Sequence, residues 1–274
     1  MKVSEDGVEA NYAINYLANF HLLSILSPAL RAQPPDRDVR IIFGTCSSYL
    51  GGSLSSSGDV PMPTPLKPTK KSSPGAHKTL HTSHPSATYS SSKLALMTFA
   101  LAFQKHLSSY VRPDKQPVFA KVLLVDPGYT RTPGMRRYLT FGSLWGLALY
   151  LLTYPIWWLI LKSPEQGAQT FLYAAMDARF AREEGGVLLK ECREYKVMRD
   201  EVGDEAKQKM LWEGTERAIE KLEKEGAVRR AAGKKEGEKE KEKADKVTGM
   251  GTPNVNGNGN GERKVGSRRT RKAA

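Results

Sequence analysis

Two side chains that could exchange a proton with a substrate stand at the head of the stretch from Tyr89 to Lys105. Tyr89 and Lys93 begin an apolar pattern that contains no Gly or Pro, so helical pitch would place the phenol and the ammonium on one face. An ammonium held there favours the phenolate and would lower the tyrosine pKa from its usual value of about 10. Tyr89 would then act as an acid or base near neutral pH. The alternative is a plain packing contact between the phenol and the lysine stem.

A polar candidate lies in the first segment, which we expect to be a helix from about Val8 to Arg31. Apolar residues recur there at near-helical steps, and Pro28 closes the pattern. Asn15 falls among residues expected to face the core, where an amide needs a hydrogen-bond partner. Asn15 is therefore either a satisfied structural amide or a residue that positions a water or a backbone carbonyl.

Small hydroxyl residues follow the first predicted strand. Residues 38–46, DVRIIFGTC, form a short apolar run rich in β-branched residues, and Ser47 and Ser48 come next. In open α/β sheets, ligands bind at the carboxyl ends of the strands. Ser48 is thus a candidate hydrogen-bond donor, although serines at strand ends are also common turn residues.

Two more strands are expected, at residues 117–125 and 185–189, and the first of them is followed by Pro127, Gly128 and Thr130. Between the two, the sequence SPEQ opens a helix with a serine cap at Ser163, a proline at the first helical position and a glutamine at the third. Strands alternating with helices predict an α/β domain with a parallel sheet over residues 1–200.

Outside this core we expect a polar helix at 201–226 and a disordered charged tail at 227–274. Residues 53–86 are dense in Pro, Ser, Thr and Lys and are expected to form a flexible, exposed insertion. Three histidines lie in this insertion, but no metal site is expected because no carboxylate or cysteine cluster accompanies them. They are His77, His81 and His84.

Charge and cysteine content narrow the function classes. The chain of 274 residues carries a formal net charge of +13, which would suit nucleic acid or an anionic membrane. Much of the excess lies in the tail among glutamates, and the sequence has no zinc-finger, RNP-like or helix-turn-helix signature, so nucleic acid is not expected as a partner. Cys46 and Cys192 form no C-x-x-C pair, which indicates neither a disulfide framework nor a zinc cluster and fits a reducing setting.

The most apolar stretch is residues 141–161, FGSLWGLALYLLTYPIWWLIL, which carries no charge. It is long enough to cross a hydrocarbon layer of about 30 Å as one helix. Pro155 interrupts it and cations flank both ends, so a re-entrant hairpin or an obliquely inserted helix competes with a full span. A buried core helix or a lid over a substrate is the remaining alternative. We expect association with a membrane or lipid droplet.

These features occur in a characteristic order. Asn15 lies in a helix, SSYLG follows a strand, YSSSK heads the next helix, and DPGYTRT follows the strand beyond it. The sequence resembles the short-chain dehydrogenase/reductase family from about Glu5 to Arg193, most closely its retinol-dehydrogenase-like, membrane-associated branch. The resemblance implies a Rossmann-like, doubly wound parallel sheet.

The resemblance also implies residue roles. Tyr89 would be the proton donor or acceptor at the carbinol oxygen, and Lys93 would hold the nicotinamide ribose and depress the tyrosine pKa. Ser48 would hydrogen-bond the substrate oxygen and Asn15 would support a proton-relay water. Ser47 is an alternative to Ser48, and Cys46 is a less favoured one.

The segment along the nicotinamide would be formed by Pro127, Gly128 and Thr130. The implied cofactor is NADP or NAD, and the implied substrate is a lipophilic alcohol or carbonyl compound of the retinoid, sterol or fatty-aldehyde class. The implied location is the cytosolic face of the endoplasmic reticulum membrane or of a lipid droplet, with the cytoplasm as alternative. The helix that begins with Tyr89 often lies in a dimer interface in this family, so a homodimer is possible.

One family feature is absent from the sequence. No TGxxxGxG turn, which would cradle the cofactor pyrophosphate, precedes Asn15. We therefore expect an incomplete sheet that lacks the first β-α-β units, and weak or no cofactor binding by the chain as given. An oxidoreductase that is truncated at its N-terminus is the favoured interpretation. A non-catalytic membrane or lipid-droplet binding protein built on a dehydrogenase remnant is the alternative.

Overall fold

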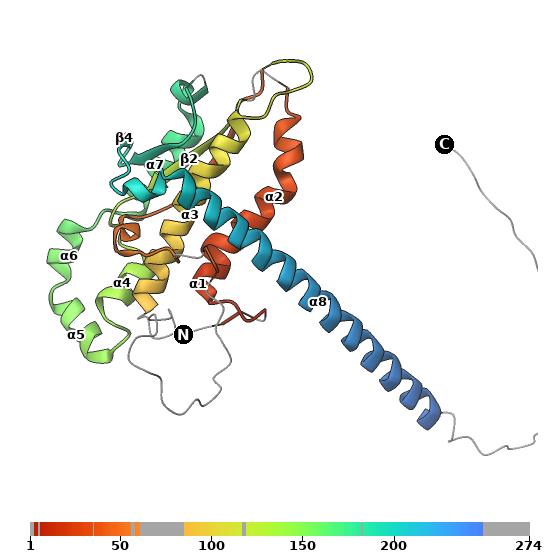
Figure 1. The fold of residues 1–274 in the computed structure, drawn as a ribbon. Helices are drawn as coiled ribbons and strands as arrows, with labels where there is room; N and C mark the ends of the chain where they lie inside the picture. Colours follow the sequence, from red (N-terminus) through yellow and green to blue (C-terminus); the bar gives the residue numbers. More distant parts are fainter. Residues whose placement is uncertain are drawn as a thin grey trace, which may run out of the picture. The chain divides into compact units, whose positions relative to one another are not determined.

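The computed structural model describes residues 3, 4, 6–34, 36–55, 58–60, 85–116, 119–181 and 183–248. The chain divides into two compact units, Met1–Lys224 and Glu225–Ala274. The first unit is an α/β domain, in which helices surround one four-stranded mixed sheet (Figure 1). Most of the predicted insertion at 53–86, including its three histidines, lies outside the described residues.

The sheet has the strand order β1-β2-β3-β4, with β1 at Val39–Gly44, β2 at Ala120–Asp126, β3 at Val187–Lys190 and β4 at Arg193–Tyr195. The first three strands are parallel and confirm the three predicted strands. Their carboxyl ends therefore meet at one edge of the sheet. The prediction of a purely parallel sheet was wrong at β4, which pairs antiparallel with β3.

A tight turn explains the antiparallel strand. Glu191 and Cys192 adopt positive φ angles of 55° and 61° between β3 and β4. Left-handed backbone at two successive positions reverses the chain within a two-residue hairpin loop. The short apolar run predicted at 185–189 gave no signal for this reversal.

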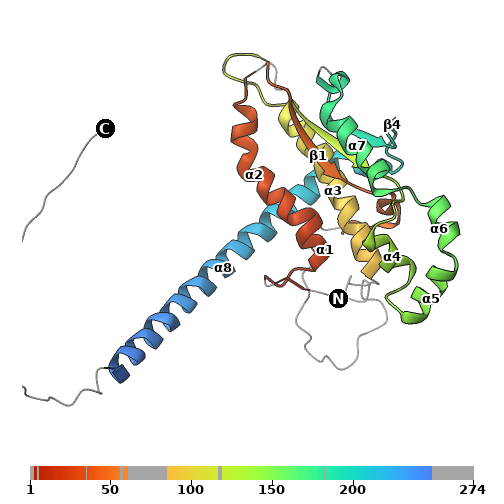
Figure 2. The same ribbon diagram turned by 180° about the vertical axis from the view of Figure 1, so that it is seen from behind.

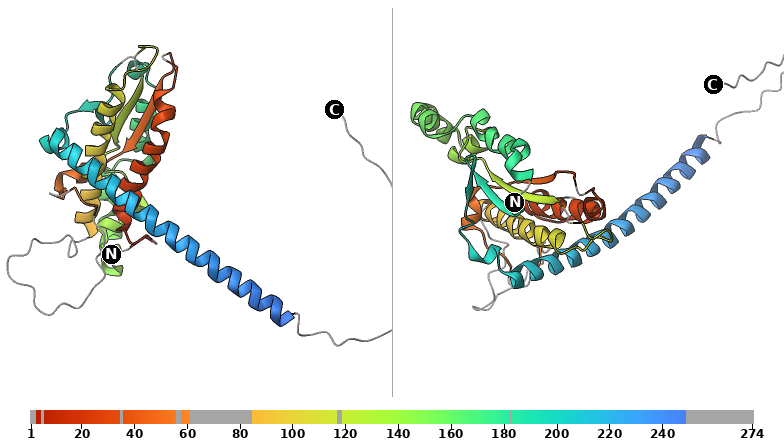
Figure 3. Two further views of the ribbon diagram at one scale, coloured as in Figure 1. Left: turned by 45° about the vertical axis from the view of Figure 1, so that its right-hand side comes forward. Right: turned by 90° about the horizontal axis from the view of Figure 1, so that it is seen from above.

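Helices cover both faces of the sheet (Figure 3). The helix α3, Pro85–Ser108, packs on β2 from one face, and α7, Pro164–Met176, packs on β1, β2 and β3 from the other. Side chains of β2 alternate between the two layers: Val122 and Leu124 belong to the larger core cluster, and Leu123 and Val125 to the smaller one. The strand is buried throughout, as its continuous apolar sequence predicted.

The first predicted helix is continuous but not uniform. It consists of α1 (Ala10–Tyr12), a π-helical turn (Ala13–Leu17) and α2 (Ala18–Arg31). The helix ends at Arg31, as predicted, and Pro28 lies inside its last turns. The π turn contains Asn15. Such turns insert one residue into the helical ladder and change the direction of the side chains they carry.

An aromatic cluster joins these helices to the start of α8, which spans Glu205–Thr248 (Figure 2). The ring of Phe99 in α3 lies 4.9 Å from that of Phe20 in α2 and 5.7 Å from that of Trp212 in α8. The predicted end of the polar helix near Gly226 was wrong. The residues that follow are mostly Glu, Lys, Arg and Ala, which have high helix propensity, and the helix continues through them to Thr248. Residues 249–274 of the predicted tail lie outside the described residues.

Between β2 and α7 the chain forms three short helices, α4 (Pro133–Leu139), α5 (Leu144–Leu152) and α6 (Tyr154–Ile160). The apolar stretch 141–161 is thus divided at Thr153. No helix in the described ranges is both long and apolar enough to cross a membrane. A single spanning helix over 141–161, one of the sequence expectations, was therefore wrong. The predicted capping box at the start of α7 is confirmed.

Short 3₁₀ helices complete the domain: η2 at Ser47–Gly51 follows β1, η4 at Ala178–Ala181 follows α7, and η5 at Asp200–Val202 precedes α8.

Candidate active site

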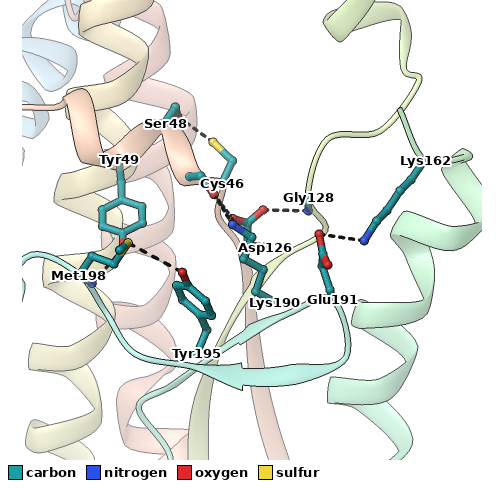
Figure 4. Close-up of polar contacts among 11 residues, drawn as sticks. Cys46, Ser48, Tyr49, Asp126, Gly128, Lys162, Lys190, Glu191, Tyr195 and Met198 are labelled. Carbon is teal, nitrogen blue, oxygen red and sulfur yellow. Dashed lines mark hydrogen bonds and ion pairs between the residues drawn. The ribbon is translucent and has the colours of Figure 1, made fainter. Parts of the chain in front are cut away.

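The carboxyl ends of β1, β2 and β3 bring polar side chains to one edge of the sheet (Figure 4). Directly after β1, the thiol of Cys46 lies 2.7 Å from the hydroxyl of Ser48. The same sulfur lies 3.5 Å from the phenol oxygen of Tyr89, which comes from the first turns of α3. The fold thus brings Tyr89 next to Cys46, although 43 residues separate the two in the sequence, and Ser48 lies beside the same thiol.

Lys93 lies one turn further along α3. Its ammonium nitrogen is 5.8 Å from the centre of the Tyr89 ring, so the two side chains share a helical face, as predicted. The ammonium donates a hydrogen bond to the carbonyl oxygen of Gly44, at 2.9 Å. Burial lowers the pKa of Lys93, and the nearby Cys46 opposes that shift.

The expected lowering of the tyrosine pKa was wrong. Burial is the largest cause that raises the pKa of Tyr89, followed by its hydrogen bond with Cys46 and by the charges of Cys46 and Asp126. Lys93, whose ammonium donates to the carbonyl of Gly44, is not among the causes of the shift in the Tyr89 pKa. Tyr89 is therefore a protonated phenol at neutral pH.

Asn15 is linked to this site through the side chain of Ser92. Its amide donates to the hydroxyl of Ser92 at 3.0 Å, and Ser92 donates to the backbone carbonyl of Tyr89 at 2.8 Å. The amide is thus satisfied, and it fixes the first turn of α3. The π turn that carries Asn15 packs on α3.

A second network at the same edge was missed by the sequence reasoning. The hydroxyl of Ser47 donates to a carboxylate oxygen of Asp126 at 2.6 Å. The ammonium of Lys190 donates to Ser47 at 3.0 Å and lies 4.0 Å from Asp126. The signal that could have found it was present, because Asp126 and Lys190 are polar residues at the ends of apolar strands.

This network separates the three candidate residues after β1. Ser47 is engaged with Asp126 and Lys190, whereas Cys46 and Ser48 lie on the side of Tyr89. The geometry therefore favours Ser48 over Ser47 as a donor beside the phenol. It also places the thiol of Cys46, the less favoured candidate, between the Ser48 hydroxyl and the Tyr89 phenol.

The predicted nicotinamide segment follows Asp126 directly. The N–H of Gly128 donates to the second oxygen of Asp126 at 2.9 Å, and Gly128 has a φ of +75° that favours glycine. Thr130 forms a parallel bridge with Lys162, and its methyl group lies against Gly167 at the start of α7. Pro127 lies against the same glycine. Gly128 is thus bonded to the network at the strand ends, while Pro127 and Thr130 lie against the start of α7.

No metal centre accompanies these residues. Within the described part of the chain, no group of three or more His, Cys, Asp or Glu side chains is placed to hold a metal ion. The polar groups at the edge are hydroxyl, phenol, thiol and ammonium groups and the carboxylate of Asp126.

Comparisons with known proteins bear on the class of this site. An uncharacterized oxidoreductase of Schizosaccharomyces pombe is 37% identical over 82% of this chain and 56% of the relative. Polyprenol dehydrogenase of Mus musculus is 34% identical over 63% of this chain and 42% of the relative. Human retinol dehydrogenase 13 is 27% identical over 79% of this chain and 55% of the relative. No protein-family model matches the sequence.

The chain spans about half the length of these curated relatives. A phenol, a serine hydroxyl and a lysine meet at the carboxyl edge of the parallel strands, which is where open α/β sheets bind their ligands. The chain belongs to the short-chain dehydrogenase/reductase family, in its retinol-dehydrogenase-like branch.

Proposed function

We propose that this chain carries the acid–base part of a nicotinamide-dependent oxidoreductase site that acts on an alcohol or carbonyl group. The observation that supports the proposal most directly is the run of contacts from Ser48 through Cys46 to Tyr89, with Lys93 one helical turn behind the phenol. These groups can hold and protonate one oxygen atom of a substrate.

Each residue has a distinct part in this proposal. Tyr89 exchanges a proton with the substrate oxygen, and the hydroxyl of Ser48 hydrogen-bonds the same oxygen. The thiol of Cys46 now connects the two, so a bound substrate oxygen would take over the contacts that Cys46 makes. In the protonated form that it has at neutral pH, Tyr89 can donate a proton to a carbonyl oxygen.

The residues present fit a nicotinamide cofactor, which would supply the hydride. Lys93 uses one of its three donors on Gly44, and the remaining two would hold the ribose of the cofactor. Gly128 lets the backbone approach a flat ring closely, since it has no side chain and a φ that favours glycine. Pro127, Gly128 and Thr130 would lie along the nicotinamide. The proposed cofactor is either NADP or NAD.

The proposal extends to fold and substrate class. Helices on both faces of parallel strands support a Rossmann-like, doubly wound sheet. The names of two relatives, polyprenol dehydrogenase and retinol dehydrogenase, refer to long-chain or lipophilic alcohols. We propose a lipophilic alcohol or carbonyl substrate of the retinoid, sterol, fatty-aldehyde or related class, and a location at the endoplasmic reticulum membrane or a lipid droplet.

The test is hydride transfer measured by nicotinamide absorbance, with lipophilic aldehydes as substrates. The 274-residue chain is assayed beside a form extended upstream, if the genomic sequence supplies an in-frame TGxxxGxG. We expect turnover by the extended form and weak cofactor binding by the shorter one in a fluorescence titration. Tyr89→Phe should abolish turnover, and Tyr110→Phe is the matched control, because this tyrosine lies just beyond the C-terminal end of α3.

Two further variants refine the site. Ser48→Ala should lower turnover strongly, whereas Ser47→Ala should act mainly through stability. Undiminished turnover in Tyr89→Phe would refute the mechanism. Membrane association without turnover in any form would favour the non-catalytic alternative.

A further inference from the structure

The residues from Phe141 to Leu161, which we call the apolar hairpin, belong to a longer segment that leaves the edge of the sheet after Gly128 and returns to it at Lys162. The ends of this longer segment, which also contains α4, are bonded to each other: the N–H of Arg131 donates to the carbonyl of Lys162 at 2.9 Å, and the N–H of Lys162 donates to the carbonyl of Tyr129 at 2.9 Å. Figures 1 and 2 show α5 and α6 at the margin of the domain, away from the helices that cover the sheet. The hairpin is therefore held at its base and contacts the core little beyond it.

The hairpin exposes apolar side chains around both helices. Trp145 is 87% exposed, Leu152 81% and Leu159 81%. Tyr150 is buried, and its ring stacks on that of Trp157 at 6.5 Å, which joins α5 to α6. A helix that is apolar all round is ordinarily covered by protein or by lipid, so we expect one of these to cover the exposed surface of the hairpin. The exposed large apolar residues of the hairpin are Phe141, Leu144, Trp145, Leu147, Leu149, Leu151, Leu152, Tyr154, Ile156, Trp158, Leu159 and Ile160.

The charged residues within the segment that carries the hairpin are all cationic, and at its base Lys162 pairs with Glu191 at 2.9 Å. No Asp or Glu occurs between Asp126 and Glu165, while Arg136 and Arg137 are exposed on α4. The guanidinium of Arg131 lies 5.4 Å from the ring centre of Trp158, at the base of the hairpin. A cationic rim around an apolar surface rich in tryptophan and tyrosine matches the headgroup region of an anionic bilayer.

A second copy of the chain fits this surface less well. A symmetric dimer would place the same patch against itself. The cationic rim would then face another cationic rim, with no carboxylate on the segment to pair with it. A lipid surface supplies both the apolar cover and the negative charge.

The helix lengths decide how the hairpin would enter the lipid. The helix α5 has 9 residues and is about 14 Å long, against a hydrocarbon core of about 30 Å. The turn between the helices is internally satisfied, since Thr153 donates to the carbonyl of Leu149 at 2.8 Å and accepts from the Trp157 indole at 2.8 Å. Few backbone groups at the turn would lose hydrogen bonds in a partly apolar layer.

We propose that the apolar hairpin is a monotopic membrane anchor that inserts into one leaflet of an anionic bilayer, with α4 at the headgroups. The hairpin lies in the interface plane and does not span. Its base is bonded to the loop that carries Gly128, so the anchor holds the candidate site next to the lipid surface. The anchor is independent of the proposed redox activity, and its test uses no turnover.

The experiment measures binding of the full chain to phosphatidylcholine vesicles with and without phosphatidylserine. We expect sedimentation with the anionic vesicles, weakened by salt, and quenching of tryptophan by lipids labelled in the acyl chain near the headgroup. The variant Leu152→Asp/Leu159→Asp should bind roughly tenfold more weakly or worse, because two exposed leucines no longer enter the lipid. The variant Arg136→Glu/Arg137→Glu should lose the preference for anionic vesicles.

The matched control is Leu22→Asp/Ile25→Asp, which changes two exposed apolar residues of α2. It should bind vesicles as the wild-type chain does. All variants change exposed residues, and circular dichroism verifies that each is folded. The proposal is overturned if the wild-type chain does not bind anionic vesicles, or if Leu152→Asp/Leu159→Asp binds undiminished. It is also overturned if these two changes abolish self-association of the chain while vesicle binding persists.

Discussion

Replacing Asp126 by asparagine tests whether the network at the strand ends holds the candidate site together. Only 4% of the Asp126 side chain is exposed, and the carboxylate accepts hydrogen bonds from Ser47 and from the N–H of Gly128. Asparagine keeps a carbonyl oxygen for Gly128 but removes the negative charge. The hydrogen bond with Ser47 becomes neutral, and Lys190 loses the carboxylate 4.0 Å away.

The expected cost follows from these contacts. A hydrogen bond to a charged group is worth about 1.5–3 kcal/mol, against about 1 kcal/mol for a neutral one. Lys190 is 26% exposed and retains its bond to Ser47, so the loss of its ion pair adds little. We expect Asp126→Asn to lower the free energy of unfolding by about 1–3 kcal/mol. Asp126→Ala removes the acceptor from both half-buried donors and should cost more, about 3–5 kcal/mol.

The assay is urea unfolding followed by circular dichroism, with the free energy obtained by linear extrapolation. A double-mutant cycle with Lys190→Met isolates the coupling between the two charges. Asp114→Asn is the matched control, because Asp114 is an exposed carboxylate paired with Arg112, and exposed pairs contribute little. If Asp126→Asn unfolds at the wild-type midpoint, the network does not stabilise the strand ends and the reasoning fails.

Two further predictions concern the core and the phenols. Phe99→Ala should cost about 3–5 kcal/mol in urea unfolding, because this 2% exposed ring fills the centre of the aromatic cluster; Val111→Ala, 80% exposed, should cost less than about 0.5 kcal/mol, and equal effects would contradict the packing argument. Stability should also fall as pH rises above about 10, because phenols of the unfolded chain ionise there while the buried ones stay protonated. The phenols whose pKa values are raised by burial are Tyr12, Tyr16 and Tyr89. In Tyr89→Phe the decline of unfolding midpoint with pH should be shallower than in the wild type, and an unaltered decline would show that the pKa of Tyr89 is not raised.

Features encoded by local periodicity were predictable from sequence. The spacing of Tyr89 and Lys93 fixed their shared face of α3, since helical pitch alone determines which residues lie one turn apart. The apolar runs located β1, β2 and β3, and the SPEQ motif located the start of α7 through its capping box. In each case the residues that carry the signal lie within a few positions of one another.

Features that depend on contacts between distant segments were not predictable. The hydroxyl of Ser47 donates to Asp126, whereas that of Ser48 lies beside Cys46. No local sequence pattern predicts which of the two serines makes which contact. The apolar stretch at 141–161 was long enough for one helix, but the structure divides it at Thr153 and leaves it exposed.

The sequence by itself determined which residues could do chemistry and in what order they occur along the chain. Only the tertiary structure decided their environment. Tyr89 and Lys93 were expected to form a pair that lowers the phenol pKa, yet burial raises it and Lys93 is directed at Gly44. The physical reason is that a pKa depends on solvent exclusion and on every nearby charge, and these are set by segments far apart in the sequence.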